Sequence, residues 1–301
     1  MFNTIFVKPM GYILKWFCSI FGGSFPLAIF FFTLAINLVF MPLNIKQQKG
    51  NASQARMKNK MAKIKEKYYE SDRNRYNDEM NKLYQESGTS TMMGCLLLFI
   101  RMPFFIAIYN VIRSPFTLML GVNSTLVESA KAAFANIMNI ADASTVTEHQ
   151  LLNGLSKLTG SEFAPLHSAA DGVNFTFFGI NLTETPSFAD GVSILWIIPL
   201  LSFLTSLLSA FVSSIMQKIN NPGAPNTMGM MLMMPVFSLI IAFTVPGAVG
   251  LYWAFSNFIS MIIMTAMQYL FAPSRTIAKL EAKEIRARRK VEEARMASFK
   301  Q

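Results

Sequence analysis

The stretch GCLLLFIRMPFF, from Gly94 to Phe105, holds one arginine, Arg101, in an otherwise apolar run. An arginine side chain stays charged in proteins, and at the centre of a bilayer it costs roughly 2.5–3.5 kcal/mol on insertion scales. Such residues nearly always face the interior of a helix bundle or a water-filled cavity. Arg101 therefore constrains how the helices around it are arranged.

The charged residues of this 301-residue chain are segregated, and their distribution indicates a membrane protein. Hydrophobic residues make up 52% of the chain, and no Asp, Glu, Lys or Arg occurs between Lys15 and Lys46 or between Lys218 and Arg275. A membrane-spanning helix needs about 20 mostly apolar residues, so both gaps are long enough to hold spans. We therefore predict an all-α membrane protein.

Five transmembrane helices are predicted, because Pro42 ends the first apolar run and the turn VPGAVG divides the last one. The predicted spans are residues 24–43, 92–112, 192–216, 227–244 and 251–271. The other predicted segments are an N-terminal outer interfacial helix (1–23), a cytoplasmic helical hairpin (44–91), an extracytoplasmic loop (113–191), a cytoplasmic loop (217–226) and a basic cytoplasmic tail (272–301).

The N-terminal segment has two interpretations. It resembles a signal peptide, but it has no clear small-x-small cleavage site and Pro9 interrupts it. We favour an uncleaved helix in the outer membrane interface, with Trp16 and Phe17 as anchors.

The charges of the loops predict the orientation. Residues 44–90 hold eleven basic and six acidic residues, and the tail after Pro273 holds nine basic and four acidic ones. Residues 112–190 hold three basic and seven acidic residues. Because cytoplasmic loops are enriched in Lys and Arg, the first loop and the C-terminus are predicted to be cytoplasmic. Five spans then place the N-terminus outside.

The first basic loop is predicted to form a helical hairpin. Apolar residues recur at helical spacing in both halves, and Ser71 or Asp72 could cap the second helix. Two interpretations stay open: two solvated helices that lean on each other, or a mobile basic arm near the membrane that contacts partners.

Polar side chains recur along one face of several predicted spans. Thr33 and Asn37 are four residues apart in the first span. Serines repeat at helical spacing in the third span (Ser202, Ser206, Ser209, Ser213), and polar residues do so in the fifth (Trp253, Ser256, Asn257, Ser260). For the serine row alone, close packing between helices is a sufficient explanation.

Arg101 favours a cavity, because no Asp or Glu lies in any predicted span to pair with it. Pro103 cannot donate a hydrogen bond to the Phe99 carbonyl, which leaves an acceptor nearby. We expect a hydrated groove with a net positive charge. Its predicted lining is Arg101, Asn37, Thr33, Trp253, Ser206, Ser256 and Asn257.

The predicted groove suits a passing anionic group but supplies no reaction chemistry. The spans contain no nucleophile–base pair, phosphate-binding glycine loop or set of metal ligands. We therefore expect neither an enzyme nor a cofactor or metal. The alternative function is an anion or small-solute transporter that uses Arg101 as its binding site, although transporters usually carry internal repeats and none is evident here.

Six pieces of the chain, in order, resemble the YidC family of membrane protein insertases. They are FVKPMGYILKW, FPLAIFFFTLAINLVFMPLNIKQQK, KMAKIKEKYYE, MGCLLLFIRMPFFIAIYNVI, MMLMMPVFSLIIAF and GLYWAFSNFISMI. The resemblance implies insertion of nascent membrane proteins into the bacterial cell membrane, alone or with the Sec translocon. It further implies five core spans around a hydrophilic groove that is open to the cytoplasm and to lipid, together with a mobile cytoplasmic hairpin.

The resemblance also bears on partners and on the groove charge. Basic tails in the family contact ribosomes, which suits RTIAKLEAKEIRARRK, although attraction to the lipid surface would also explain that segment. No direct nucleic-acid specificity is expected. The family usually has its groove arginine where this chain has Asn37, and a neutral residue, often Gln, where it has Arg101. Thr33 matches a groove position, and Trp253 matches an aromatic position that faces substrate.

Overall fold

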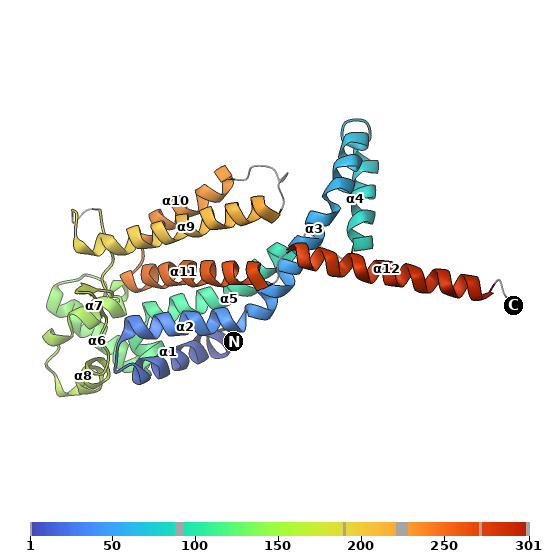
Figure 1. The fold of residues 1–301 in the computed structure, drawn as a ribbon. Helices are drawn as coiled ribbons and strands as arrows, with labels where there is room; N and C mark the ends of the chain where they lie inside the picture. The colour runs from blue at the N-terminus through green and yellow to red at the C-terminus, as the bar shows by residue number, and fades with distance from the viewer. Residues whose placement is uncertain (1, 88–92, 189–190, 221–227, 271–272, 299–301) are drawn as a thin grey trace. The chain divides into compact units, whose positions relative to one another are not determined.

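The computed structural model describes residues 2–87, 93–188, 191–220, 228–270 and 273–298. The chain forms two compact units. The first unit comprises residues 1–39, 99–212 and 226–261, and the second comprises residues 40–98, 213–225 and 262–301. The described part is helical almost throughout, as the composition predicts (Figure 1).

The first unit begins with two helices that pack side by side. The π-helix η1 (Asn3–Val7) continues into α1 (Lys8–Ile20), and a turn through Gly22 and Gly23, both with positive φ, leads into α2 (Phe25–Val39) (Figure 1). Trp16 is 58% exposed, while Val7 and Leu14 are fully buried. The helix α1 is therefore amphipathic, as an interfacial helix requires.

Four helices supply the remaining apolar segments: α5 (Met93–Arg113), α9 (Ile197–Asn220), α10 (Met228–Ala242) and α11 (Gly247–Leu270). Among the described residues, Ile194–Met216 and Gly247–Leu270 are long and apolar enough to cross a membrane, and a third span results if Phe25–Val39 and Met41–Gln48 count as one. Since α10 has only 15 residues, the five-span arrangement remains a prediction.

The exposed side chains of α9 and α10 lie on apolar stripes. On α9, Leu200, Leu204 and Leu208 recur every fourth residue and each is about half exposed. On α10, Val236 and Ile240 do the same. Continuous apolar stripes of this length are costly in water but suit contact with lipid chains.

The segment after α5 folds into a small helical region with its own core. Its helices and strands are η2 (Pro115–Leu120), α6 (Ser124–Met138), η3 (Ala143–Thr145), α7 (Glu148–Asn153), η4 (Leu155–Lys157), η5 (Ser161–Phe163), α8 (Ala164–Asp171), β1 (Thr176–Phe177), β2 (Ile180–Asn181) and η6 (Ile194–Trp196). The antiparallel pair β1–β2 corrects the all-α expectation in a small way. Here Gly179, with φ of 82°, allows the tight turn between the strands.

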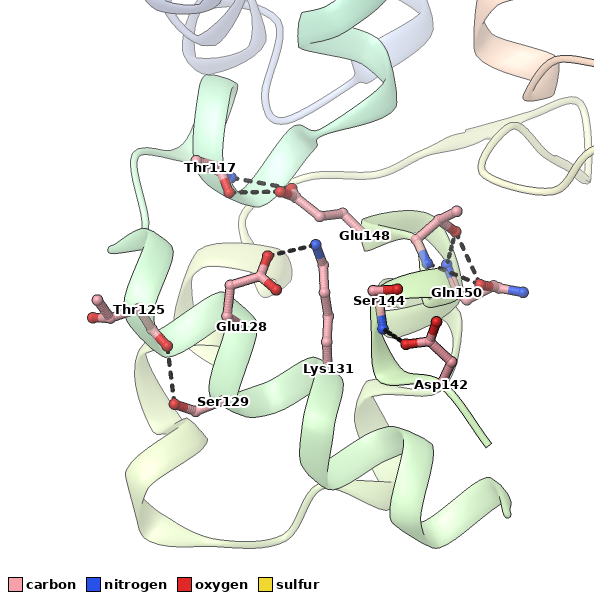
Figure 2. Close-up of polar contacts among 10 residues, drawn as sticks. Thr117, Thr125, Glu128, Ser129, Lys131, Asp142, Ser144, Glu148 and Gln150 are labelled. Carbon is pink, nitrogen blue, oxygen red and sulfur yellow. Dashed lines mark hydrogen bonds and ion pairs between the residues drawn. The ribbon is translucent and has the colours of Figure 1, made fainter. Parts of the chain in front are cut away.

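Polar contacts join the helices of this region (Figure 2). The buried Glu148 carboxylate on α7 accepts hydrogen bonds from the backbone N–H of Thr117, at 3.1 Å, and from its hydroxyl. Burial raises the pKa of Glu148, while the Thr117 hydrogen bonds and the nearby Lys131 oppose that rise. Lys131 itself pairs with Glu128 at 2.8 Å.

The second unit contains two helices in the range of the predicted hairpin. They are α3 (Met41–Tyr68) and α4 (Arg73–Ser87), and they pack against each other. Asp72 caps α4, since its carboxylate accepts a hydrogen bond from the Arg75 backbone N–H at 3.0 Å, whereas the Ser71 hydroxyl donates to the Lys67 carbonyl. The basic helix α12 (Pro273–Ser298) contacts α3 in the same unit (Figure 1).

Candidate functional site

The polar side chains of α2 turn toward α11. Thr33 and Asn37 are buried, with exposed fractions of 1% and 7%. The Thr33 hydroxyl donates to the Ile29 carbonyl at 2.6 Å, and the Asn37 amide donates to the Thr33 carbonyl at 2.9 Å. The Ser260 hydroxyl of α11 donates to the Asn37 side-chain oxygen at 3.1 Å. A polar contact therefore joins the two helices on the face where the sequence predicts the groove.

Aromatic side chains hold α5 and α2 against α11. The ring of Phe105 stacks on Trp253 with centroids 5.9 Å apart and an interplanar angle of 13°. It also lies 6.4 Å from the ring of Tyr252. On the other side, Phe30 of α2 meets Phe255 edge-to-face at 5.2 Å. Trp253, a predicted site residue, thus stands at the contact between α5 and α11.

Arg101 lies one turn before Phe105 on α5 and is half-buried. Its guanidinium comes within electrostatic reach of the Tyr252 hydroxyl on α11, and that hydroxyl is in turn within reach of Ser256. Pro103 lies inside α5, where it interrupts the backbone hydrogen bonds next to the arginine. The charge therefore faces polar groups of a neighbouring helix.

The structure brings together most of the predicted site residues, through α11. Asn37, whose amide bonds to the Thr33 carbonyl, contacts α11 at Ser260. Arg101 comes within electrostatic reach of Tyr252, which is in turn bonded to Ser256. Asn257, half-buried, lies between these two contacts along the same helix.

The first serine of the row on α9, Ser202, packs against a neighbouring helix, as the packing interpretation predicts. Ser202 is fully buried, and its hydroxyl lies 3.4 Å from that of Ser238 on α10. Ser206, one turn further along α9, is half-buried, and none of the contacts above joins it to Asn37 or Arg101. A groove role for Ser206 stays a prediction.

The sequence reasoning left three residues out of the site. Tyr252 is the residue that Arg101 approaches, Ser260 bonds to Asn37, and Phe105 stacks on Trp253. A signal for Ser260 exists, because it continues the polar stripe of the fifth span. Tyr252 carries a hydroxyl inside an apolar run, which is a weaker signal of the same kind. Within the described residues, no group of three His, Cys, Asp or Glu is placed to hold a metal ion.

Comparison with known proteins finds similarity to bacterial membrane proteins over most of the chain. The family model described as "60Kd inner membrane protein" matches residues 16–274. The membrane protein insertase YidC 2 of Listeria innocua is 25% identical over 287 residues, which cover 94% of this chain and 77% of that protein. The membrane protein insertase YidC 2 of Bacillus anthracis is 25% identical over 261 residues, or 85% of this chain and 77% of the relative.

Proposed function

Because the chain belongs to the 60Kd inner membrane protein family, we propose that it is a membrane protein insertase that moves nascent transmembrane segments from the cytoplasm into the bilayer. The observation that carries the proposal is the position of Arg101. The arginine is half-buried on α5 and faces Tyr252, while neighbouring helices present apolar side chains outward.

The charge of Arg101 acts on the polar outer segment of a substrate. In a site of low dielectric constant, an opposite charge is attracted far more strongly than in water. A short acidic segment that enters between α2, α5 and α11 is drawn toward the guanidinium. The polar side chains of these helices replace part of the water that the segment loses.

The apolar segment of the substrate then moves into lipid. Transfer of apolar surface out of water supplies the driving force. Partial hydration of the groove lowers the cost for the polar flank, whose backbone groups would otherwise cross hydrocarbon without partners. The aromatic pair Phe105 and Trp253 offers a flat contact surface beside this path.

The proposed partners follow from the same arrangement. Nascent membrane proteins are the proposed substrates. The protein itself is proposed to have its N-terminus outside the cell and its C-terminus in the cytoplasm. The basic helix α12 is proposed to contact the ribosome, and cooperation with the Sec translocon extends the range of substrates.

Reconstitution of the purified protein into liposomes tests the proposal. A labelled single-span protein with an acidic outer tail is added, and insertion is measured by protease protection. Wild-type protein should insert it, and Arg101→Gln should insert it roughly tenfold more slowly, the factor that corresponds to about 1.4 kcal/mol of lost attraction. The same substitution should slow the insertion of a substrate with a neutral tail much less.

Variants that keep or move the charge serve as controls. Arg101→Lys should retain most of the activity, and Asn37→Arg combined with Arg101→Gln should restore insertion of acidic substrates. Lys157→Gln removes an exposed positive charge far along the sequence and should behave as wild type. Failure of the wild-type protein to insert either substrate would contradict the insertase proposal. Full activity of Arg101→Gln on acidic tails would contradict the attraction.

A further inference from the structure

A second polar pocket lies at the C-terminal end of α5, away from Arg101. It has a volume of about 480 Å³, and its lining includes Tyr109 and Arg113 of α5, His149 of α7, Glu184 after β2, and Thr244 and Pro246 between α10 and α11. Arg113 lies twelve positions after Arg101 in the sequence, which corresponds to about 18 Å along α5. The pocket is therefore distinct from the proposed groove.

His149 is the first indication that this pocket holds a ligand. The side chain is only 4% exposed, and neither ring nitrogen has a hydrogen-bond partner of normal geometry in the structure, although the Ile112 carbonyl comes near the ring. A capping box between Thr147 and Gln150 fixes the start of α7 and so places the ring. A buried polar group without a partner costs free energy, which a ligand that bonds to it would recover.

Two opposite charges line the same pocket without pairing to each other. The Arg113 guanidinium donates a hydrogen bond of 3.4 Å to the Tyr109 hydroxyl, and the Glu184 carboxylate accepts one of 3.0 Å from Asn181. The ion pairs described in the structure join Lys82 to Glu79 and Lys131 to Glu128, so neither includes Arg113 or Glu184. An occupant with both a negative and a positive group would satisfy the two side chains at once.

The position of the pocket in the fold indicates which kind of zwitterionic molecule could occupy it. Its walls include the end of the apolar helix α5 and the turn between the apolar helices α10 and α11. Tyr and Arg at the end of an apolar helix are typical of the membrane–water interface, where lipid head groups lie. A phosphate diester is an acceptor that Arg binds well, and an ammonium group suits a carboxylate.

We propose that this pocket binds the head group of a zwitterionic phospholipid. The phosphate accepts hydrogen bonds from the Arg113 guanidinium and from the His149 ring N–H, and the ammonium group contacts the Glu184 carboxylate. Such a bound lipid would connect the end of α5 to the start of α7 and to the turn before α11. The proposal goes beyond insertion and does not depend on Arg101.

Native mass spectrometry of the detergent-purified full-length protein tests the proposal. The probes are phosphatidylethanolamine and phosphatidylglycerol with the same acyl chains, added in a concentration series. Wild-type protein should retain the ethanolamine lipid at lower concentration than the glycerol lipid. Arg113→Gln and His149→Phe should each weaken retention about tenfold or more, as expected for loss of a hydrogen bond to a charged group. Glu184→Gln should abolish the preference between the two lipids.

The controls separate pocket chemistry from general lipid adhesion. His167→Phe removes the other histidine, whose ring nitrogen lies 2.8 Å from the Leu158 carbonyl, and should leave lipid retention unchanged. Arg113 and Glu184 are exposed, so their variants test binding even if His149→Phe fails to fold. Soluble glycerophosphoethanolamine should compete with the lipid if the pocket reads the head group. The proposal would be overturned if wild-type protein retained the two lipids equally and Arg113→Gln retained them as well as wild type does. It would also be overturned if glycerophosphoethanolamine failed to compete with the bound lipid.

Discussion

At the scale of single residues, the site depends on which polar groups the helices bury and which they leave accessible. Arg101 is half-buried, whereas Thr33 and Asn37 are buried and bonded to α2 and α11. The family resemblance implies an arginine at the position of Asn37 and a neutral residue, often Gln, at the position of Arg101. We therefore propose that the groove charge lies on α5 in this protein and not on α2. The neutral Asn37 can then bond to Ser260, which an arginine at that position would not allow in the same way.

A graded reactivity of introduced cysteines is expected at these positions. Single cysteines at positions 101, 37 and 33, in a chain with Cys18 and Cys95 replaced by Ser, should react with a water-soluble maleimide in that order. The exposed fraction falls from intermediate at Arg101 to 7% at Asn37 and 1% at Thr33. Labelling rates measured from the cytoplasmic side check the order. The absence of labelling at all three positions would argue against a hydrated groove.

His149 should make stability depend on pH. Burial, the main cause, and the nearby Arg113 lower its pKa from 6.5 to about 4. The neutral ring is therefore favoured in the folded state. Its contribution to the free energy of unfolding is present above pH 6.5 and is lost as the pH falls toward 4. The loss is about 3 kcal/mol at most.

Thermal unfolding in lipid-free detergent at pH 7.5 and pH 4.5 measures this contribution. The decrease in melting temperature at low pH should be smaller for His149→Phe than for wild type. The effect of Glu148, whose raised pKa acts in the opposite direction, is present in both proteins and cancels in the comparison. The same decrease in both proteins would refute the assignment.

At the scale of elements, close approach between α1 and η2 positions the N-terminal helix. Gly11 of α1 faces the Leu118 carbonyl so closely that a Cβ atom there would overlap its oxygen. Lys15, one turn later, donates a hydrogen bond to the Leu120 carbonyl at 2.8 Å. Glycine at position 11 is thus required by the packing and not by a turn.

Gly11→Ala should therefore destabilise the first unit. We expect a loss of about 1–3 kcal/mol, typical of overpacking against a backbone atom that cannot move freely. Gly229→Ala in α10 is the matched control, because a Cβ atom there meets no atom within 4 Å and alanine favours a helix. Melting temperatures of the two variants in detergent provide the measurement. Equal melting temperatures would contradict the close approach.

At the scale of the whole molecule, the polar contacts around Arg101 and the basic helices belong to different units. The first unit holds the polar contacts around α11, and the second holds the basic helices α3 and α12. α12 has exposed side chains throughout residues 285–293, so its charges are available to a partner.

The basic tail should bind ribosomes through electrostatic contacts. Replacement of Arg286, Arg288, Arg289 and Lys290 by Gln should weaken co-sedimentation with ribosomes. The slope of the logarithm of the binding constant against the logarithm of the salt concentration should become shallower by about 3. Binding to anionic vesicles is measured in parallel, since attraction to lipid is the alternative. Loss of vesicle binding with unchanged ribosome binding would favour the lipid interpretation.

Sequence patterns alone determined the class of the protein and many of its helices. Long charge-free runs allow few folds except membrane helices, and Pro42, Pro246 and the caps mark helix ends locally. Within the described residues, the all-helical expectation fails at the short β1–β2 pair, whose formation depends on pairing between strands. Residues 113–191 are predicted only as an extracytoplasmic loop, whereas the structure describes short helices there whose apolar residues join the core.

Only the tertiary structure decided which polar groups meet. The spacing of Ser202 and of Ser260 is equally helical, yet Ser202 packs on α10 and Ser260 bonds to Asn37 on α2. Likewise, Arg113, His149 and Glu184 are far apart in the chain and line one pocket. Local sequence specifies which face of a helix is polar, because side-chain direction follows the helical period. The partner of that face depends on how helices distant in sequence pack together.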